Sequence, residues 1–198
     1  MLDFAELIAD HKAQLGRAVE RFRAEEDADF IRHLRLAGGW IDGRWPRILY
    51  GELSLVAMVN EYPAPPGCLM LYGHSWGHYT PLTPWDECGP GFPPLLERSV
   101  DEMGTKLLLC PPPTAKQIAV WGNTLRYRYR VAHEITAEVV TVDEGQRGAV
   151  LLAALIEAMR DLAAETTVVQ LHKGLSGLPT AGTPAYLYET LIREWEGR

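Results

Sequence analysis

The stretch Thr124-Leu-Arg-Tyr-Arg-Tyr-Arg-Val131 carries the clearest secondary-structure signal in the chain. Apolar and aromatic residues alternate with arginines, and a period of two is typical of a β-strand with one buried and one exposed face. The alternation predicts that Tyr127 and Tyr129 face the core, toward the helices of the protein. Three arginines then face solvent or a partner: Arg126, Arg128 and Arg130.

The flanking residues extend the β prediction. Residues 116–121 are β-prone, and they lead through Gly122-Asn123, a common hairpin dipeptide, into the arginine-bearing strand. Residues 134–143 follow as a further predicted strand, so this region predicts an antiparallel meander. A purely structural role for the arginines is then pairing across strands with Glu134 and Glu138.

Helical periodicity marks both ends of the chain. Apolar residues at helical spacing predict a helix over residues 2–23, and a second helix over 27–36 that ends at the glycine pair 38–39. Residues 148–165 predict a long helix that is apolar on most of its circumference and therefore buried. A threonine followed by proline predicts a last helix that begins at residue 184.

The middle of the chain before the arginine-bearing strand mixes β-prone runs with prolines and glycines. Residues 47–62 and 68–73 favour strands, residues 94–104 favour a short helix, and residues 105–110 favour a buried strand. We therefore expect one α+β domain over residues 1–198. It has an N-terminal helical hairpin, a central mixed sheet with an antiparallel meander, and two C-terminal helices packed on the sheet.

Composition narrows the range of partners and compartments. The net charge is −7 without a block of basic residues, which disfavours binding to nucleic acid or to an anionic membrane. Three cysteines are too few for a disulfide framework, and the acidic N-terminal stretch lacks a long apolar run. We expect a cytoplasmic protein without a cofactor.

A possible nucleophile lies in Gly73-His-Ser-Trp-Gly77, which has the form G-x-S-x-G. The apolar run before it and the two glycines resemble the nucleophile elbow of the α/β-hydrolase family. The resemblance implies that Ser75 is the nucleophile, His172 its general base and Asp143 the acid that orients the histidine. A small serine hydrolase is therefore one functional hypothesis.

Other side chains near this motif suggest different sites. His74 and His78, together with Cys88, are weak candidates for metal ligands, because their spacing matches no established zinc pattern. Aromatic side chains in a loop-rich segment are typical both of loop anchoring and of protein interfaces. The aromatic candidates for an interface are Trp76, Tyr79 and Trp85.

The sequence favours a non-catalytic function over the hydrolase. Pro81 and Pro84 stand where the helix of a nucleophile elbow would run, and an antiparallel meander does not match the parallel sheet of the hydrolase family. We expect an acidic protein that binds another protein, or a second copy of itself. It would act as a neutralising partner or as a subunit of a larger assembly such as a virus particle.

Overall fold

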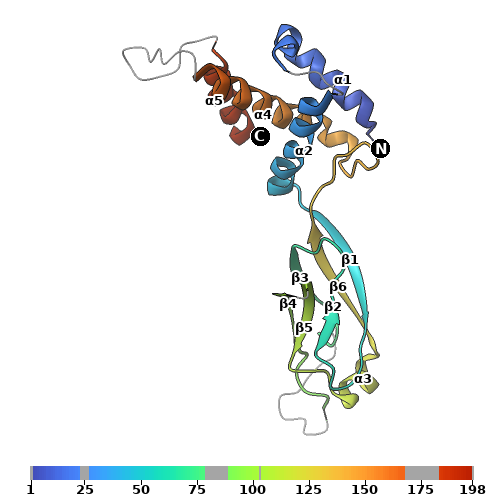
Figure 1. Ribbon diagram of the computed structural model, residues 1–198. Helices are drawn as coiled ribbons and strands as arrows, with labels where there is room; N and C mark the ends of the chain where they lie inside the picture. Colours follow the sequence, from blue (N-terminus) through green and yellow to red (C-terminus); the bar gives the residue numbers. More distant parts are fainter. Residues whose placement is uncertain (1, 23–26, 79–88, 103, 168–182, 198) are drawn as a thin grey trace. The chain divides into compact units, whose positions relative to one another are not determined.

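The computed structural model describes residues 2–22, 27–78, 89–102, 104–167 and 183–197. The chain divides into two compact units (Figure 1). The helical unit combines residues 1–46 with residues 133–198, and the β unit comprises residues 47–132. The α+β class is confirmed, with helices near both ends and antiparallel sheets between them. The single-domain organisation stays a prediction.

The helical unit contains α1 (Phe4–Leu15), η1 (Gly16–Arg21), α2 (Ala28–Arg44), η3 (Glu144–Gln146), α4 (Arg147–Thr167) and α5 (Pro184–Gly197). Helix α4 lies at the centre of this unit, because its buried residues contact α1, α2 and α5. Ile156 is fully buried, as predicted, but Leu155 is only half-buried. Thr183 caps α5 as expected, since its Oγ1 accepts a hydrogen bond from the backbone N–H of Tyr186. No helix in the described ranges combines the length and apolar character needed to cross a bilayer.

Helix α2 continues through the glycines that were expected to end it. Phe30, Leu34 and Ile41 are fully buried at helical spacing against the rest of the helical unit. Burial of this stripe outweighs the cost of glycine in a helix, which is about 1 kcal/mol. Gly38 has a packing role, because a Cβ at this position would lie 3.3 Å from the backbone oxygen of His133.

The β unit consists of two three-stranded antiparallel sheets. One sheet has the order β1 (Arg47–Ser54), β6 (Thr124–Val131), β3 (Met70–His74). The other has the order β2 (Glu61–Pro63), β5 (Gly104–Cys110), β4 (Leu95–Asp101). Buried side chains from both sheets form a single apolar cluster, so the sheets cover each other's inner faces.

Strand β6 alternates as the sequence predicts, but the partner of its buried face differs. Tyr127 and Tyr129 belong to the apolar cluster of the β unit, together with residues of the second sheet, and the long helices of the described chain, α1, α2, α4 and α5, contribute no residue to this cluster. Tyr127 also lies across Gly51 of β1, where a Cβ would come within 2.4 Å of its ring. Glycine at this position makes room for the aromatic ring on the neighbouring strand.

Three further local predictions are wrong. Residues 115–121 form helix α3 (Ala115–Trp121), which a Thr114–Gln117 capping box initiates, so the predicted hairpin does not form. Residues 95–101 form strand β4, which pairs along its whole length with β5. Residues 134–143 contain only an isolated bridge between Ile135 and Val140, whose side chains contribute to the helical core.

Candidate functional site

The outer face of the β1–β6–β3 sheet carries basic, aromatic and apolar side chains together. We name it the arginine–tyrosine face, and it consists of Ile48, Tyr50, Glu52, Met70, Tyr72, Arg126, Arg128 and Arg130. Register explains this grouping: Arg126 lies opposite Glu52, Arg128 opposite Tyr50, and Arg130 between Ile48 and Met70. Paired residues of neighbouring strands project to the same side of a sheet.

Exposure distinguishes this face from an ordinary solvated surface. Tyr50 is 78% exposed, and the apolar side chains of Ile48 and Met70 are also exposed. Arg126 donates a 2.7 Å hydrogen bond to Glu52, which replaces the predicted pairing with Glu134 and Glu138. No described carboxylate forms an ion pair with Arg128. A cluster of exposed aromatic, apolar and arginine side chains is typical of protein-binding surfaces.

A hollow of about 680 Å³ opens beside this face. Its lining residues are Tyr50, Tyr72, Gly73, His74, Ser75, His78, Arg126, Tyr127 and Arg128. The hollow therefore brings two of the predicted interface arginines together with the predicted nucleophile. The β-bulge between Leu71 and Gly73 contributes to this arrangement, because it shifts the end of β3 relative to β6.

Ser75 is exposed in the hollow at the end of β3, and the residues after it begin a turn. Its hydroxyl makes no hydrogen bond with any described histidine. His74 instead donates from Nε2 to the backbone oxygen of Pro94 at 2.8 Å, since a carbonyl can only accept. Burial lowers the pKa of His74. An activated serine needs a nearby base, and the catalytic role of Ser75 stays a prediction.

The two other residues of the hydrolase hypothesis are Asp143 and His172. Asp143 is exposed in the helical unit, at the N-terminal end of η3, where its backbone N–H donates to Gln146. Ser75 belongs to the β unit. His172 lies outside the described residues, so its role stays a prediction.

The remaining candidates are the predicted aromatic interface residues and the predicted metal ligands. Trp76 is buried, donates from Nε1 to the backbone oxygen of Gly122, and packs edge-to-face on Trp121. The rings of His74 and His78 lie 5.0 Å apart, but the described ranges contain no cluster of three metal-ligating side chains. Tyr79, Trp85 and Cys88 lie outside the described residues.

His11, His33 and Asp161 form a hydrogen-bond network in the helical unit that was not predicted from the sequence. His33 lies 2.8 Å from Asp161 through Nε2, and its Nδ1 lies 3.3 Å from Nε2 of His11. Because the carboxylate only accepts, His33 donates to Asp161 and accepts from His11. Both imidazole rings are fully buried, so a substrate cannot reach them. The network instead links helices α1, α2 and α4.

Burial and hydrogen bonding together determine the protonation states of His11, His33 and Asp161. Desolvation, and then repulsion from His33, lowers the pKa of His11 to about 4. Desolvation also lowers the pKa of His33, although the hydrogen bond to Asp161 opposes the shift. Burial alone would raise the pKa of Asp161, but hydrogen bonds from Arg32 and His33 outweigh it and lower that pKa. Both imidazoles are therefore neutral and the carboxylate is charged at neutral pH.

Comparison with known proteins does not assign the chain to a family. No family model matches the chain, and no curated protein matches it.

Proposed function

We propose that the protein is a non-catalytic binding protein, which docks its arginine–tyrosine face on an acidic surface of another protein. The partner is a different protein or a second copy of the chain, within a larger assembly such as a virus particle. The observation that carries the proposal is the combination of exposed Tyr50, exposed apolar side chains and Arg128 on one face of the β1–β6–β3 sheet.

The chemistry of this face suits such a role. Tyrosine and arginine are enriched at the centres of protein interfaces, and tyrosine supplies a large contact area at a small cost in side-chain entropy. Arg128 presents a guanidinium group that can bind a carboxylate through two parallel hydrogen bonds. The hollow beside it offers a concave surface for an incoming side chain.

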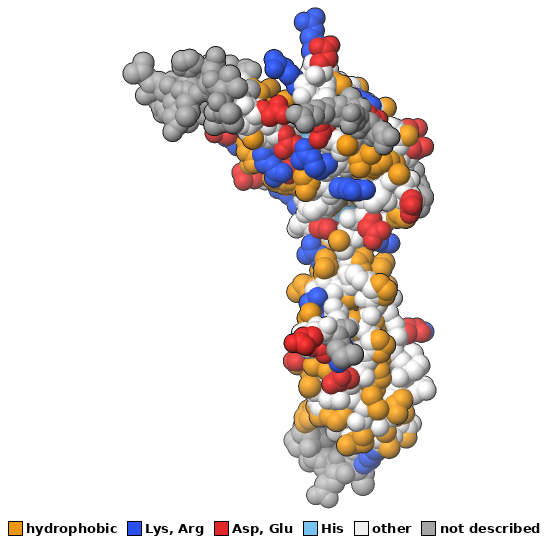
Figure 2. Space-filling model, viewed as in Figure 1, with side chains coloured by type: hydrophobic (Ala, Val, Ile, Leu, Met, Phe, Trp, Pro, Cys, Tyr) orange, Lys and Arg blue, Asp and Glu red, His pale blue; other side chains and the backbone are white. Residues whose placement is uncertain are grey.

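Charge distribution supports an acidic partner. The β unit holds seven Lys and Arg residues and seven Asp and Glu residues, so it is neutral in total. Three of these seven basic residues lie on the arginine–tyrosine face, where Glu52 is the only acid. Figure 2 shows that charged side chains are sparse on the visible surface of the β unit and frequent on the helical unit. The face therefore concentrates positive charge on a neutral unit.

The test is an exchange of the two exposed arginines of this face, Arg126 and Arg128, for glutamine. Arg126→Gln/Arg128→Gln is compared with the wild-type chain in affinity capture from the native cells, and a captured partner is then measured by calorimetry at two salt concentrations. Each exposed charge contributes up to about 1 kcal/mol, so we expect about a tenfold loss of affinity and a flatter salt dependence.

The matched control removes the same charge from another surface. Arg17 and Arg35 are exposed in the helical unit, and Arg17→Gln/Arg35→Gln should leave affinity for the partner unchanged. Equal affinities for the wild-type chain and the Arg126/Arg128 variant would refute the proposed face. Equal losses in both double variants would show that total charge, and not this face, controls binding.

The serine hydrolase is the second candidate, and the exposure of Ser75 in the same hollow as His78 is the observation that favours it. A fluorophosphonate probe reacts with an activated serine. We expect no labelling, because no described histidine contacts the Ser75 hydroxyl. Labelling of the wild-type chain that disappears in Ser75→Ala would establish the hydrolase and overturn the non-catalytic proposal.

A further inference from the structure

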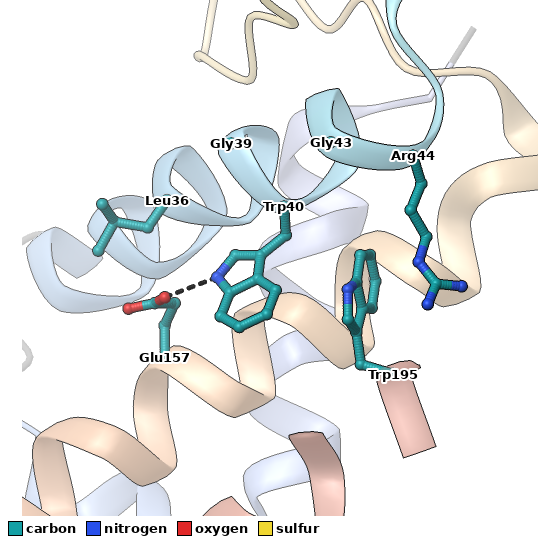
Figure 3. Close-up of a pocket in the computed structure, with 7 residues that line it drawn as sticks. All are labelled: Leu36, Gly39, Trp40, Gly43, Arg44, Glu157 and Trp195. Carbon is teal, nitrogen blue, oxygen red and sulfur yellow. Dashed lines mark hydrogen bonds between the residues drawn. The ribbon is translucent and has the colours of Figure 1, made fainter. Parts of the chain in front are cut away.

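A second hollow, of about 560 Å³, opens on the helical unit and is independent of the arginine–tyrosine face. Its lining residues come from α2, α4 and α5 and are Leu36, Gly39, Trp40, Gly43, Arg44, Glu157 and Trp195. We name it the tryptophan pocket (Figure 3). Two indole rings form its walls, and a carboxylate lies at its base.

Two glycines at the pocket have no role in the packing of the fold. Gly39 and Gly43 lie one turn apart on α2, and a Cβ added to either would meet no atom within 4 Å. Each glycine destabilises a helix by about 0.5–1 kcal/mol relative to alanine. Their neighbour Gly38 is explained by its contact with His133, but these two are not. Their absent side chains leave the pocket open along α2.

The base of the pocket is a buried carboxylate. Glu157 is only 2% exposed, and its Oε1 accepts a 2.7 Å hydrogen bond from Nε1 of Trp40. Its Oε2 forms an ion pair with Arg160 of the same helix, but it has no hydrogen-bond partner among the described residues. Arg160 already compensates the charge of Glu157, but each carboxylate oxygen carries two lone pairs, so Oε2 can also accept a hydrogen bond from a second cationic donor.

The walls of the pocket suit a cation as well. Trp40 and Trp195 pack edge-to-face with their ring centres 5.7 Å apart. The guanidinium of Arg44 lies 5.4 Å from the ring centre of Trp195, so this indole already accepts one cation. Figure 3 shows Arg44 and Glu157 on opposite sides of Trp195, which leaves the Glu157 side, beside Trp40 and Leu36, free of Arg44.

We propose that the tryptophan pocket binds a basic side chain of a partner protein, with its ammonium or guanidinium group on Glu157 and its aliphatic stem against Trp40 and Leu36. The long stems of lysine and arginine bury well on apolar surface while the charged end reaches an acid. The entire net charge of −7 lies in the helical unit, because the β unit is neutral, and this charge attracts a basic partner.

The experiment measures binding of single capped amino acids to the full chain. The probes are Nα-acetyl-lysine amide and Nα-acetyl-arginine amide, and the uncharged control is Nα-acetyl-norleucine amide. The readout is the indole N–H signal of Trp40 in a nitrogen–proton NMR spectrum, assigned with Trp40→Phe. We expect saturable shifts with a Kd of roughly 1 mM for the two cations and none for norleucine.

Three variants separate the contributions to binding. Glu157→Gln keeps an acceptor for Trp40 but removes the charge, and it should weaken binding at least tenfold. Arg160→Gln removes the internal competitor and should tighten binding several-fold. Gly43→Leu should abolish binding without lowering the melting temperature, because a Cβ at this position meets no atom within 4 Å and the larger side chain fills the pocket.

Several results would overturn the proposal. These are equal shifts with norleucine, undiminished binding in Glu157→Gln, or unchanged binding in Gly43→Leu. Butylammonium distinguishes a partner's side chain from a free small amine. Tighter binding of the capped amino acids supports the partner, whereas tighter binding of butylammonium contradicts it.

Discussion

Replacement of Gly51 by alanine tests the contact that positions strand β6 and the hollow beside it. A Cβ at Gly51 would lie 2.4 Å from Cζ and 2.5 Å from the hydroxyl oxygen of Tyr127. Carbon atoms in ordinary contact are about 3.5–4.0 Å apart, so the ring must move by about 1 Å. Tyr127 is buried in the β unit, where overpacking costs about 1–3 kcal/mol.

Urea unfolding of the full chain measures this cost. We expect Gly51→Ala to lower the free energy of unfolding by about 1–3 kcal/mol, and the melting temperature by about 2–4 °C for each kcal/mol. Gly148→Ala is the control, because its Cβ would meet nothing in the first turn of α4. It should not destabilise the chain.

A double-mutant cycle identifies the cause of the loss. Tyr127→Leu removes the ring, and in this background Gly51→Ala should cost less than about 0.5 kcal/mol, because alanine also restricts the unfolded chain. If Gly51→Ala costs the same with and without the tyrosine ring, the clash is not the cause. The reasoning about this strand pair would then be wrong.

Three other measurements test the fold. Because burial lowers the pKa of His11 from 6.5 to about 4, the unfolded chain binds the proton more readily. Stability should therefore fall as the pH drops from 6.5 toward 4, and a slope that His11→Gln leaves unchanged would contradict the buried histidine pair. Ile156→Ala should cost about 2–5 kcal/mol in urea unfolding, and Leu155→Ala clearly less, since only Ile156 is fully buried; equal losses would show that the face is misassigned. Thr114→Ala removes the capping box of α3 and should cost about 1 kcal/mol, whereas unchanged stability would mean that the box is not needed.

The sequence predicted those parts of the fold that depend on strong local periodicity. The alternation of β6, the length of α4 and the cap of α5 are all local patterns, and the structure contains each of them. The α3 helix also had a local signal in Thr114 and Gln117, but the β-prone residues after it outweighed this signal in the prediction.

Pairing between distant segments could not be predicted in the same way. Strand β1 pairs with β6 across more than sixty intervening residues, and Arg126 therefore meets Glu52 instead of the nearby Glu134. The arginine face was predicted because it needs only a period of two. The exposure of Tyr50 follows from the alternation of β1, which is also a local pattern in the sequence. The tryptophan pocket has no such local signal, because it depends on three helices that meet only in the folded chain.

The division of the chain into units has a consequence for synthesis on the ribosome. Every residue of the β core lies between positions 47 and 132, so this unit can fold as soon as that segment has emerged. Helices α1 and α2 leave the ribosome earlier, but they pack against α4, which begins at Arg147. The apolar faces of α1 and α2 therefore stay without their α4 partner in the nascent chain until α4 has been synthesised, and transiently exposed apolar surface favours aggregation.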